Sequence, residues 1–388
     1  MGIEFCKRFG RKKIVMKKRD LFVFSGQSNM MGAAVLPPKM HIAVSDSYEY
    51  KHKTRRLGAS VGEFVTAGYP CGEFSYTDAV LETAYSLENI DENGKSKLDN
   101  YSKNTYFCPA MCNLKNTESY EEYSFDFFSE SSMVAGPSMA PMFASEWEKR
   151  GQRCAYAHIA KGSVSIMHYF DADMLEEYNY RITKYNEANA TEFATVLTNT
   201  MWEGAASYFE KKVGDFFADA EKHFVGDDMR TKIFVWCQGE SDATLCGFLY
   251  KMRLEILWKH LKKLGFTHFF CVRIGYWVVR GENKIHEIME AQEQFCREND
   301  NCHIITRAMS YMSHKAVDSN GWFVKEPLDE YRNCRDSYFG FKNPHINEKG
   351  FALVAKRMAD NAVRILRDGN DPILEEENVA KIIADMRK

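Results

Sequence analysis

Apolar residues gather in five short runs that are rich in β-branched and aromatic side chains. These runs are residues 21–25, 153–160, 232–237, 268–274 and 303–306. Strands of a parallel sheet are buried on both faces, and they therefore read as nearly continuous apolar runs without polar alternation. We expect a parallel β-strand at each of these five places.

Helical patterns lie between and after these runs. Apolar residues with helical spacing cover 142–150, 245–264 and 285–298, and glycines directly follow the first two of these segments. A longer helix is expected at 196–223, and terminal helices are expected at 347–367 and 373–387. Strands that alternate with helices indicate right-handed βαβ units. The pattern therefore predicts an α/β fold, a three-layer α/β/α sandwich around a central parallel sheet of about five strands.

One long segment follows neither pattern. The stretch of about 110 residues between the first strand and the helix near Met142 is rich in Tyr, Ser, Asn, Glu and Gly and has no sustained period. Such loops in α/β proteins lie over the strand ends and shape the ligand site, and a partly disordered excursion is the alternative. We expect one domain at 20–370 with a large insertion at 33–130, followed by a C-terminal helix at 371–388.

Positive charge is concentrated at the N-terminus. Residues 1–19 contain eight Lys or Arg residues and one acid, whereas the whole chain has a net charge of −3. We expect residues 1–19 to form a flexible basic leader, with a membrane or nucleic-acid arm as the alternative. A chain without a global positive field is not expected to bind nucleic acid.

Several other classes of protein are excluded by features that the chain lacks. No apolar run has the length of a signal-peptide core or a membrane span, so no membrane partner is expected. The 11 cysteines are odd in number and scattered, which fits a reducing compartment, and we expect a cytoplasmic protein. Cys108 and Cys112 lack a second pair of metal ligands, and phosphate-binding glycine motifs are absent, so neither a metal nor another cofactor is expected. The oligomeric state stays open.

A serine directly follows the first predicted strand. Ser28 lies in the sequence Ser-Gly-Gln-Ser-Asn-Met at 25–30, where the strand ends and a helix would begin. Ligands of open parallel sheets bind at the carboxyl ends of strands, and a helix N-terminus there offers backbone N–H groups to a developing oxyanion. Ser28 is therefore a candidate nucleophile.

Two further segments supply the partners that a nucleophilic serine needs. His345 stands just before the predicted helix at 347–367, and histidine is the side chain best suited to accept a serine proton near neutral pH. Gln238, Glu240 and Asp242 follow the predicted strand at 232–237, so they should emerge at the same sheet edge as Ser28. A carboxylate there can orient the imidazole, and both Glu240 and Asp242 are candidates.

These segments resemble the sialate O-acetylesterase and acetyl xylan esterase group of carbohydrate esterases, a branch of the SGNH hydrolases. The resemblance rests first on Gly-Gln-Ser-Asn-Met at 26–30, Gln-Gly-Glu-Ser-Asp at 238–242 and the block around His345. Further matches are Gly-Pro-Ser at 136–138, Phe-Ala at 143–144, Ala-Lys-Gly-Ser at 160–163 and Ala-Gln at 291–292. The matches follow the family's order from residue 21 to about 365 but do not cover 33–130.

The resemblance implies an SGNH, flavodoxin-like fold and hydrolysis of acetyl esters on a sialic acid or xylo-oligosaccharide type of carbohydrate. Ser28 would attack the ester carbonyl, His345 would act as base and then as acid, and Glu240 would be the acidic partner. The backbone N–H groups of Ser28 and Gly162 and the side-chain amide of Gln238 would form the oxyanion hole, each donor stabilising the transition state by about 3–4 kcal/mol. The candidate substrate-binding residues are Gln27, Asn29, Asp242, Trp277 and Trp322.

Three positions depart from the family pattern. Lys342 stands where many SGNH enzymes have an aspartate three residues before the histidine, which strengthens Glu240 as the acidic partner. Cys237 replaces a frequent histidine and is interpreted as a small buried residue, and Lys161 replaces a glycine before Gly162. The alternative functions are a catalytically impaired carbohydrate-binding protein on the same scaffold and a short-chain lipid or general esterase.

Overall fold

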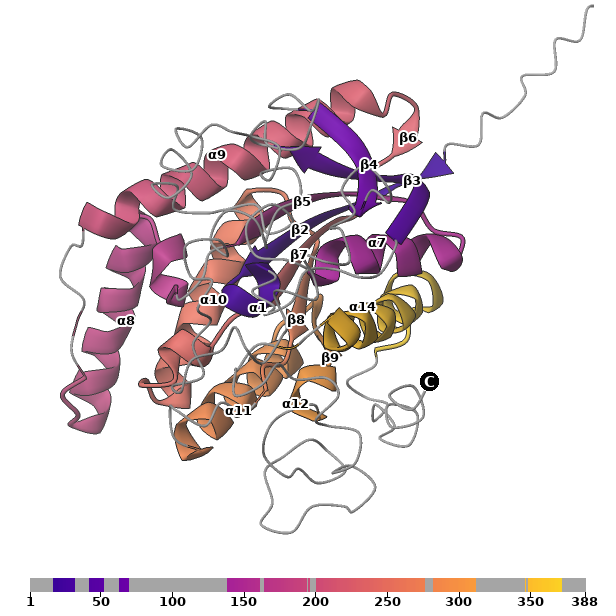
Figure 1. Ribbon diagram of the computed structural model, residues 1–388. Helices are drawn as coiled ribbons and strands as arrows, with labels where there is room; N and C mark the ends of the chain where they lie inside the picture. The colour runs from indigo at the N-terminus through magenta and orange to yellow at the C-terminus, as the bar shows by residue number, and fades with distance from the viewer. Residues whose placement is uncertain are drawn as a thin grey trace, which may run out of the picture.

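A seven-stranded sheet forms the centre of the molecule, and helices cover both of its faces (Figure 1). The computed structural model describes residues 17–31, 42–51, 63–69, 138–160, 164–193, 195, 200–275, 282–311, 346 and 348–371. The predicted α/β sandwich is confirmed. No helix within these ranges is both long and apolar enough to span a bilayer.

The sheet is doubly wound. Its strands are β2 (Asp20–Gly26), β3 (Ile42–Lys51), β4 (Glu63–Tyr69), β5 (Cys154–Ala160), β7 (Lys232–Cys237), β8 (His268–Val272) and β9 (Cys302–Thr306). They lie in the order β4-β3-β5-β2-β7-β8-β9, in which β4 is antiparallel and every other pairing is parallel. The five predicted strands, β2, β5, β7, β8 and β9, are all confirmed, and they have the flavodoxin-like order 2-1-3-4-5.

Two strands of the sheet, β3 and β4, lie within the segment expected to be an insertion. The sheet therefore extends beyond the five strands expected. β3 has the sequence IAVSDSYEYK, in which polar and charged residues interrupt the apolar ones. β3 therefore lacks the continuous apolar run that identifies the other parallel strands. Its polar side chains can be buried because they form hydrogen bonds within the protein. One example is Tyr50, which is buried and donates a hydrogen bond to Asp219 at 2.6 Å.

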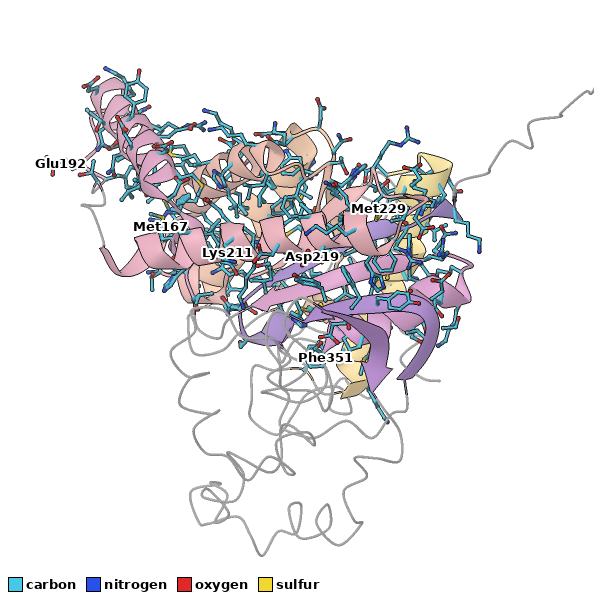
Figure 2. The ribbon with its side chains drawn as sticks, turned by 90° about the horizontal axis from the view of Figure 1, so that it is seen from above. Met167, Glu192, Lys211, Asp219, Met229 and Phe351 are labelled. Carbon is cyan, nitrogen blue, oxygen red and sulfur yellow. The ribbon has the colours of Figure 1, made fainter. Side chains whose placement is uncertain are left out.

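The helices form the two outer layers. α7 (Met139–Lys149) and α14 (Glu348–Val363) pack together on one face of the sheet, and α14 continues into a π-helical turn, η5 (Arg364–Asp368). α9 (Thr200–His223), α10 (Gly247–Lys263) and α11 (Glu282–Glu298) belong to the other layer. Figure 2 shows α9, marked by Lys211 and Asp219, running along that side of the sheet. A one-turn helix, α12 (Ala308–Tyr311), follows β9.

The predicted helices are confirmed where the structure describes them, with shifted ends. α7 begins at Met139 rather than at 142, since a proline such as Pro141 is tolerated in the first turn of a helix. α8 (Ala172–Asn189) has no counterpart among the predicted helices, and it packs on α10 through a narrow stripe of buried residues that includes Met174, Tyr178 and Ile182. The helix expected at 373–387 lies outside the described residues.

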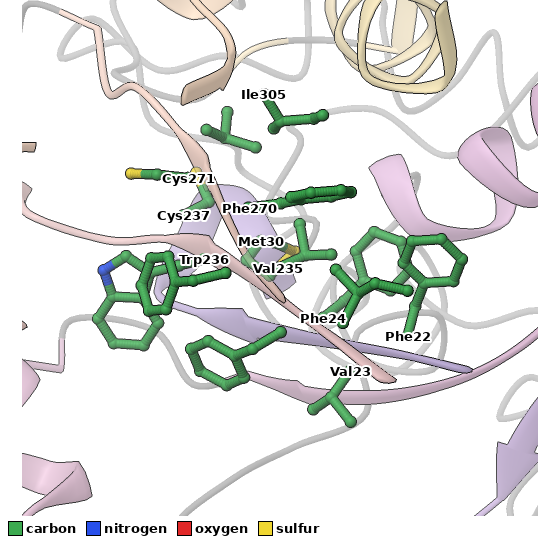
Figure 3. Packing of buried hydrophobic residues seen from close by; sticks show 14 of the residues in the cluster. Phe22, Val23, Phe24, Met30, Val235, Trp236, Cys237, Phe270, Cys271 and Ile305 are labelled. Carbon is green, nitrogen blue, oxygen red and sulfur yellow. The ribbon is translucent and has the colours of Figure 1, made fainter. Parts of the chain in front are cut away.

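Aromatic side chains fill the core on both sides of β2 and β7. Phe22 packs its ring against Phe143 and Trp147 of α7, with centroids 4.9 Å and 5.8 Å apart. Trp236 points to the other layer, where its ring contacts that of Tyr169 at 4.9 Å. Figure 3 shows these strands with apolar side chains on both faces, which explains their continuous apolar sequence.

The described chain begins inside the segment expected to be a flexible leader. Lys17 and Lys18 form β1 (Lys17–Lys18), which pairs in parallel with β6 (Asp227–Asp228). Arg19 is buried, and its guanidinium forms ion pairs with Asp46 and Asp227, both at 2.7 Å. The basic residues closest to β2 are therefore part of the fold, whereas 1–16 lie outside the described residues.

Candidate active site

The carboxyl ends of β2 and β7 meet at the point where the strand order reverses. β2 pairs with β5 on one side and with β7 on the other. The crevice outside such a reversal is where open α/β sheets bind their ligands. Figure 1 shows the one-turn helix α1 (Ser28–Met31) at the end of β2, near the middle of the sheet. Ser28 therefore occupies the position at which this topology places a ligand.

The turn between β2 and Ser28 requires a glycine. Gly26 has a φ of +140°, and a Cβ atom at this residue would lie 2.1 Å from the carbonyl oxygen of Cys237. The next residue, Gln27, donates its backbone N–H to the same carbonyl at 3.0 Å. The turn is therefore held directly against β7. Within 26–30, Ser28 is the residue with a partly exposed side chain.

Buried polar groups support this turn from within the protein. Tyr169 lies on a 3-10 helix, η2 (Ile166–Tyr169), and its hydroxyl donates to the Gly26 carbonyl and accepts from the Gly26 N–H, both at 3.2 Å. Burial raises the pKa of the Tyr169 hydroxyl, so it remains a hydrogen-bond donor. His158 Nε2 lies 2.7 Å from the carbonyl oxygen of Met30. Tyr169 and His158 are absent from the sequence-based candidates because no motif distinguishes them from other core residues.

Gln27 links the Ser28 turn to the segment after β7. Its side-chain oxygen accepts hydrogen bonds from the backbone N–H groups of Gly239 at 3.4 Å and Ser241 at 3.2 Å. The side chain is buried. The predicted contact of Gln27 with substrate stays a prediction, and the contacts described here are made within the protein.

Glu240 and Asn29 form a buried pair beside Ser28. Glu240 begins a 3-10 helix, η3 (Glu240–Asp242), and its Oε1 accepts a hydrogen bond from Asn29 Nδ2 at 3.2 Å. Asn29 is 3% exposed and Glu240 is 4% exposed. Burial raises the pKa of the Glu240 carboxyl, and the hydrogen bond from Asn29 opposes that shift. The second oxygen of Glu240, Oε2, is buried without a hydrogen-bond partner among the described residues.

Asn29 also contacts the segment that follows His345 in the chain. Its Oδ1 accepts the backbone N–H of Ile346 at 3.4 Å, and Ile346 is fully buried. Residue 346 is thereby brought beside the residue next to Ser28, although 317 positions separate it from Asn29. His345 itself lies outside the described residues.

Gln238 and Asp242 hold the segment after β5. Gln238 Nε2 donates to the carbonyl of Val164 at 3.0 Å and to Asp242 Oδ2 at 2.6 Å. Asp242 also accepts from Ser165 Oγ at 2.6 Å and from the backbone N–H of Ile166 at 2.8 Å. Both amide hydrogens of Gln238 are thus directed at acceptors within the protein. Its predicted oxyanion role stays a prediction.

Three residues on α10 and α11 contact Gln238 and Asp242. The hydroxyl of Tyr250 donates to the backbone carbonyl of Gln238 at 2.7 Å. Gln292, part of the Ala-Gln motif, donates to the same carbonyl at 2.8 Å. Arg253 Nη1 lies 3.5 Å from Asp242 Oδ1 and provides the opposite charge. Tyr250 and Arg253 carry no sequence signal beyond their place on a helix whose apolar stripe faces the core.

The structure thus brings together most of the predicted site residues. Those near the ends of β2 and β7 are Gln27, Ser28, Asn29, Gln238, Glu240 and Asp242. Those outside the described residues are Gly162, Trp277, Trp322 and His345. Cys237 is buried, and burial raises the pKa of its thiol, as expected for a small core residue that is no nucleophile.

One group in the described part of the chain has the side chains of a metal site. Ligand atoms of Asp171, Glu210 and His260 lie within 4.8 Å of one another. His260 Nε2 is 2.9 Å from Glu210, and His260 Nδ1 is 3.6 Å from Asp171. The two carboxylates thus approach different ring nitrogens of His260. The group belongs to α9, α10 and the N-cap of α8, and none of its residues comes from the segments around Ser28.

No family model matches this sequence, and no curated protein matches it. Among solved structures, a protein from Arabidopsis thaliana is 15% identical with a TM-score of 0.42, over 88% of this chain and 97% of that one. A carbohydrate acetylesterase from Xanthomonas citri is 13% identical with a TM-score of 0.40, over 90% of this chain and 57% of that one. NanS is 9% identical with a TM-score of 0.47, over 91% of this chain and 99% of that one. Similarities at this level do not indicate an activity.

Proposed function

We propose that this protein is a serine esterase that removes acetyl groups from a carbohydrate, with Ser28 as nucleophile, His345 as general base and Glu240 as acidic partner. The single observation that supports this most directly is the double contact of Asn29. Its side chain donates to Glu240 and accepts from the backbone N–H of Ile346. Asn29 directly follows Ser28 in the chain, and Ile346 directly follows His345.

The reaction proceeds in two acyl transfers. His345 takes the hydroxyl proton of Ser28 while Oγ bonds to the ester carbonyl carbon. The bond from that carbon to the sugar oxygen then breaks, and His345 gives the proton to the departing sugar oxygen. In the second transfer His345 takes a proton from water as the water oxygen bonds to the acetyl carbon. The bond from that carbon to Ser28 Oγ then breaks, His345 gives the proton to Oγ, and acetic acid leaves and ionises to acetate.

The assignment of the base is supported by chain connectivity. His345 directly precedes Ile346, and consecutive Cα atoms are about 3.8 Å apart. The backbone N–H of Ile346 reaches the side chain of Asn29, which directly follows Ser28. A contact between Ser28 and the His345 imidazole is therefore compatible with the described positions.

The choice of Glu240 over Asp242 is supported by the partners that each already has. Asp242 accepts from Gln238, Ser165 and Ile166, so its oxygens are engaged. Glu240 Oε2 is buried without a hydrogen-bond partner in the described part of the chain. Buried polar atoms without partners are rare, and an imidazole N–H is a suitable donor for this oxygen.

The oxyanion is assigned to the backbone N–H groups of Ser28 and Gly162. Gln238, whose amide donates to Val164 and Asp242, is assigned to holding 164–166, the segment that follows Gly162. In this proposal Gln238 supports the oxyanion hole through that segment, and direct donation from its side chain to the oxyanion stays a prediction.

The experiment that tests this proposal measures acetate release from acetylated xylo-oligosaccharides, O-acetylated sialic acids and simple acetylated hexoses. We expect wild-type protein to release acetate from at least one class and Ser28→Ala to release none while keeping its fold. Ser207→Ala, on the exposed face of α9, is the matched control and should retain wild-type activity. Activity of Ser28→Ala at the wild-type rate would overturn the proposal.

The same panel distinguishes the two alternatives. Binding of glycans without acetate release indicates an impaired carbohydrate-binding protein, which the Lys161 and Lys342 departures favour. Hydrolysis of an octanoyl ester as fast as an acetyl ester indicates a lipid or general esterase, because a pocket shaped for acetyl should discriminate against the longer chain.

A further inference from the structure

The side chain of Asn29 uses both ends of its amide within the protein. Nδ2 donates to Glu240 Oε1 at 3.2 Å, and Oδ1 accepts the N–H of Ile346 at 3.4 Å. The side chain is 3% exposed, so it has almost no surface to offer a ligand. The three segments that the proposed reaction requires therefore meet at this one amide.

We infer that Asn29 is a positioning residue, which sets the spacing between the Ser28 turn, Glu240 and the segment that carries His345, rather than a residue that binds substrate. This inference rests on the proposed function. It assigns Asn29 a role different from the substrate contact that the sequence suggests.

An asparagine suits this position because its amide has a donor and an acceptor in one plane at the end of a short side chain. Aspartate would retain the acceptor for Ile346 but would place a second carboxylate against Glu240. Alanine would lose both contacts. Gln27 also has an amide, but its oxygen accepts from Gly239 and Ser241.

The backbone around Asn29 is held firmly enough for its side chain to position other groups. Gly26 packs against the carbonyl of Cys237 on one side of the turn. On the other side the carbonyl of Met30 lies 2.7 Å from His158 Nε2, and the Met30 side chain is fully buried. Asn29 thus lies between two fixed points.

The contact with Glu240 has an electrostatic consequence. Burial raises the pKa of the Glu240 carboxyl, and the Asn29 N–H stabilises its charged form. The charged form is the one that orients and stabilises an imidazolium. Asn29 therefore affects both the place of the histidine segment and the charge state of its partner.

The experiment compares Asn29→Ala and Asn29→Asp with wild-type protein in kcat, KM and the pH profile of kcat/KM. We expect Asn29→Ala to lower kcat about 100-fold, the loss that follows when a catalytic group is displaced by roughly 1 Å. KM should change less than about twofold, because uniform binding of substrate is not affected. Asn189→Ala is the matched control, since Asn189 is exposed and donates a hydrogen bond to Tyr185 of its own helix.

The pH profile separates positioning from a loss of stability. Asn29→Asp adds a carboxyl group beside Glu240 and the Ile346 N–H, so in the proposed site the acid limb of kcat/KM should move to higher pH. Unfolding alone would lower the whole profile without moving this limb. Melting temperatures of both variants show whether each is folded. If Asn29→Ala does not fold, the isosteric variant Asn29→Asp still provides the test.

Amide hydrogen exchange at Ile346 gives a readout that needs no activity. Asn29→Ala removes the acceptor of this N–H and should speed its exchange at least tenfold, whereas Asn29→Asp should protect it. A wild-type protein that releases no acetate overturns the proposed function and the catalytic role of Asn29 with it. An active wild-type enzyme whose Asn29 variants keep its kcat and pH profile overturns this inference alone.

Discussion

Gln238 Nε2 donates a hydrogen bond of 2.6 Å to Asp242 Oδ2, across a turn of four residues at the end of β7. Asp242 in turn accepts from Ser165 and Ile166, which lie in the segment between β5 and η2. The segment after β7 and the segment after β5 are thereby joined. The polar residues of the 238–242 motif act largely on one another and on the loops beside them.

Asp242→Asn should weaken this junction. The asparagine loses the negative charge that faces Arg253 and presents an N–H group to one of its present donors. Breaking one side of a buried ion pair destabilises a protein by about 3–5 kcal/mol, which we expect in urea unfolding. Asp228→Asn is the control, because Asp228 forms a surface ion pair with Arg230. Its loss should lower the free energy of unfolding by less than about 1 kcal/mol. Equal stability of the two variants would contradict this account of Asp242.

Gly26→Ala should prevent the Ser28 turn from forming. The added Cβ would lie 2.1 Å from the Cys237 carbonyl oxygen, and the φ of +140° is strained for any residue with a Cβ. We expect a loss of about 4 kcal/mol or more in the free energy of unfolding. Gly214→Ala, within α9, meets no atom within 4 Å and should be neutral or stabilise by up to about 1 kcal/mol. A stable Gly26→Ala protein would show that the turn is not required to be this tight.

Glu240→Gln should lower kcat without unfolding the protein. An amide cannot stabilise the imidazolium, and the loss of the equivalent charge in a serine triad lowers kcat by about 1,000-fold or more. Because burial raises the pKa of Glu240, replacing the carboxyl by a neutral group should leave the melting temperature equal or higher. Steady-state kinetics and thermal unfolding measure both effects. Glu192→Gln, at an exposed position, is the control. A Glu240→Gln enzyme that keeps the wild-type kcat would show that Glu240 is not the acidic partner.

His268 should make the fold sensitive to acid. Burial, with smaller effects from His303 and Lys18, lowers the pKa of His268 from 6.5 to about 4. Between these two values the unfolded chain binds a proton that the folded protein excludes, so stability is full above pH 6.5 and falls as the pH falls toward 4.

His268→Gln should flatten this dependence when the free energy of unfolding is measured between pH 7 and 4. The wild-type protein measured over the same pH range is the comparison. If the variant keeps the wild-type slope, His268 is not the group that titrates.

The sequence predicts best those elements that are buried on all sides. The five predicted strands, β2, β5, β7, β8 and β9, are continuous apolar runs, and each is found within two residues of its predicted ends. β3 escapes prediction because its sequence mixes polar and apolar residues, although Ser47 and Glu49 on it are buried. α8 escapes because most of its surface is polar and only a narrow stripe faces α10.

The predicted site residues come together for a simple topological reason: carboxyl ends of neighbouring parallel strands share one edge. What the sequence does not give is the direction of each side chain. Gln27, Asn29 and Asp242 have the polarity of ligand-binding residues, yet each is buried and bonded to backbone or side-chain groups of the protein. The sequence of a motif does not distinguish a polar residue that binds substrate from one that bonds to a neighbouring loop.

Covalent labelling of Ser28 is the most direct test of the central claim. The intact protein would be treated with a fluorophosphonate ester, digested, and its labelled peptide sequenced by mass spectrometry. We predict a single adduct on Ser28, formed at a rate that falls strongly in His345→Ala and is zero in Ser28→Ala. An adduct on a different residue, or ester hydrolysis by Ser28→Ala at the wild-type rate, would contradict the claim that Ser28 is the nucleophile.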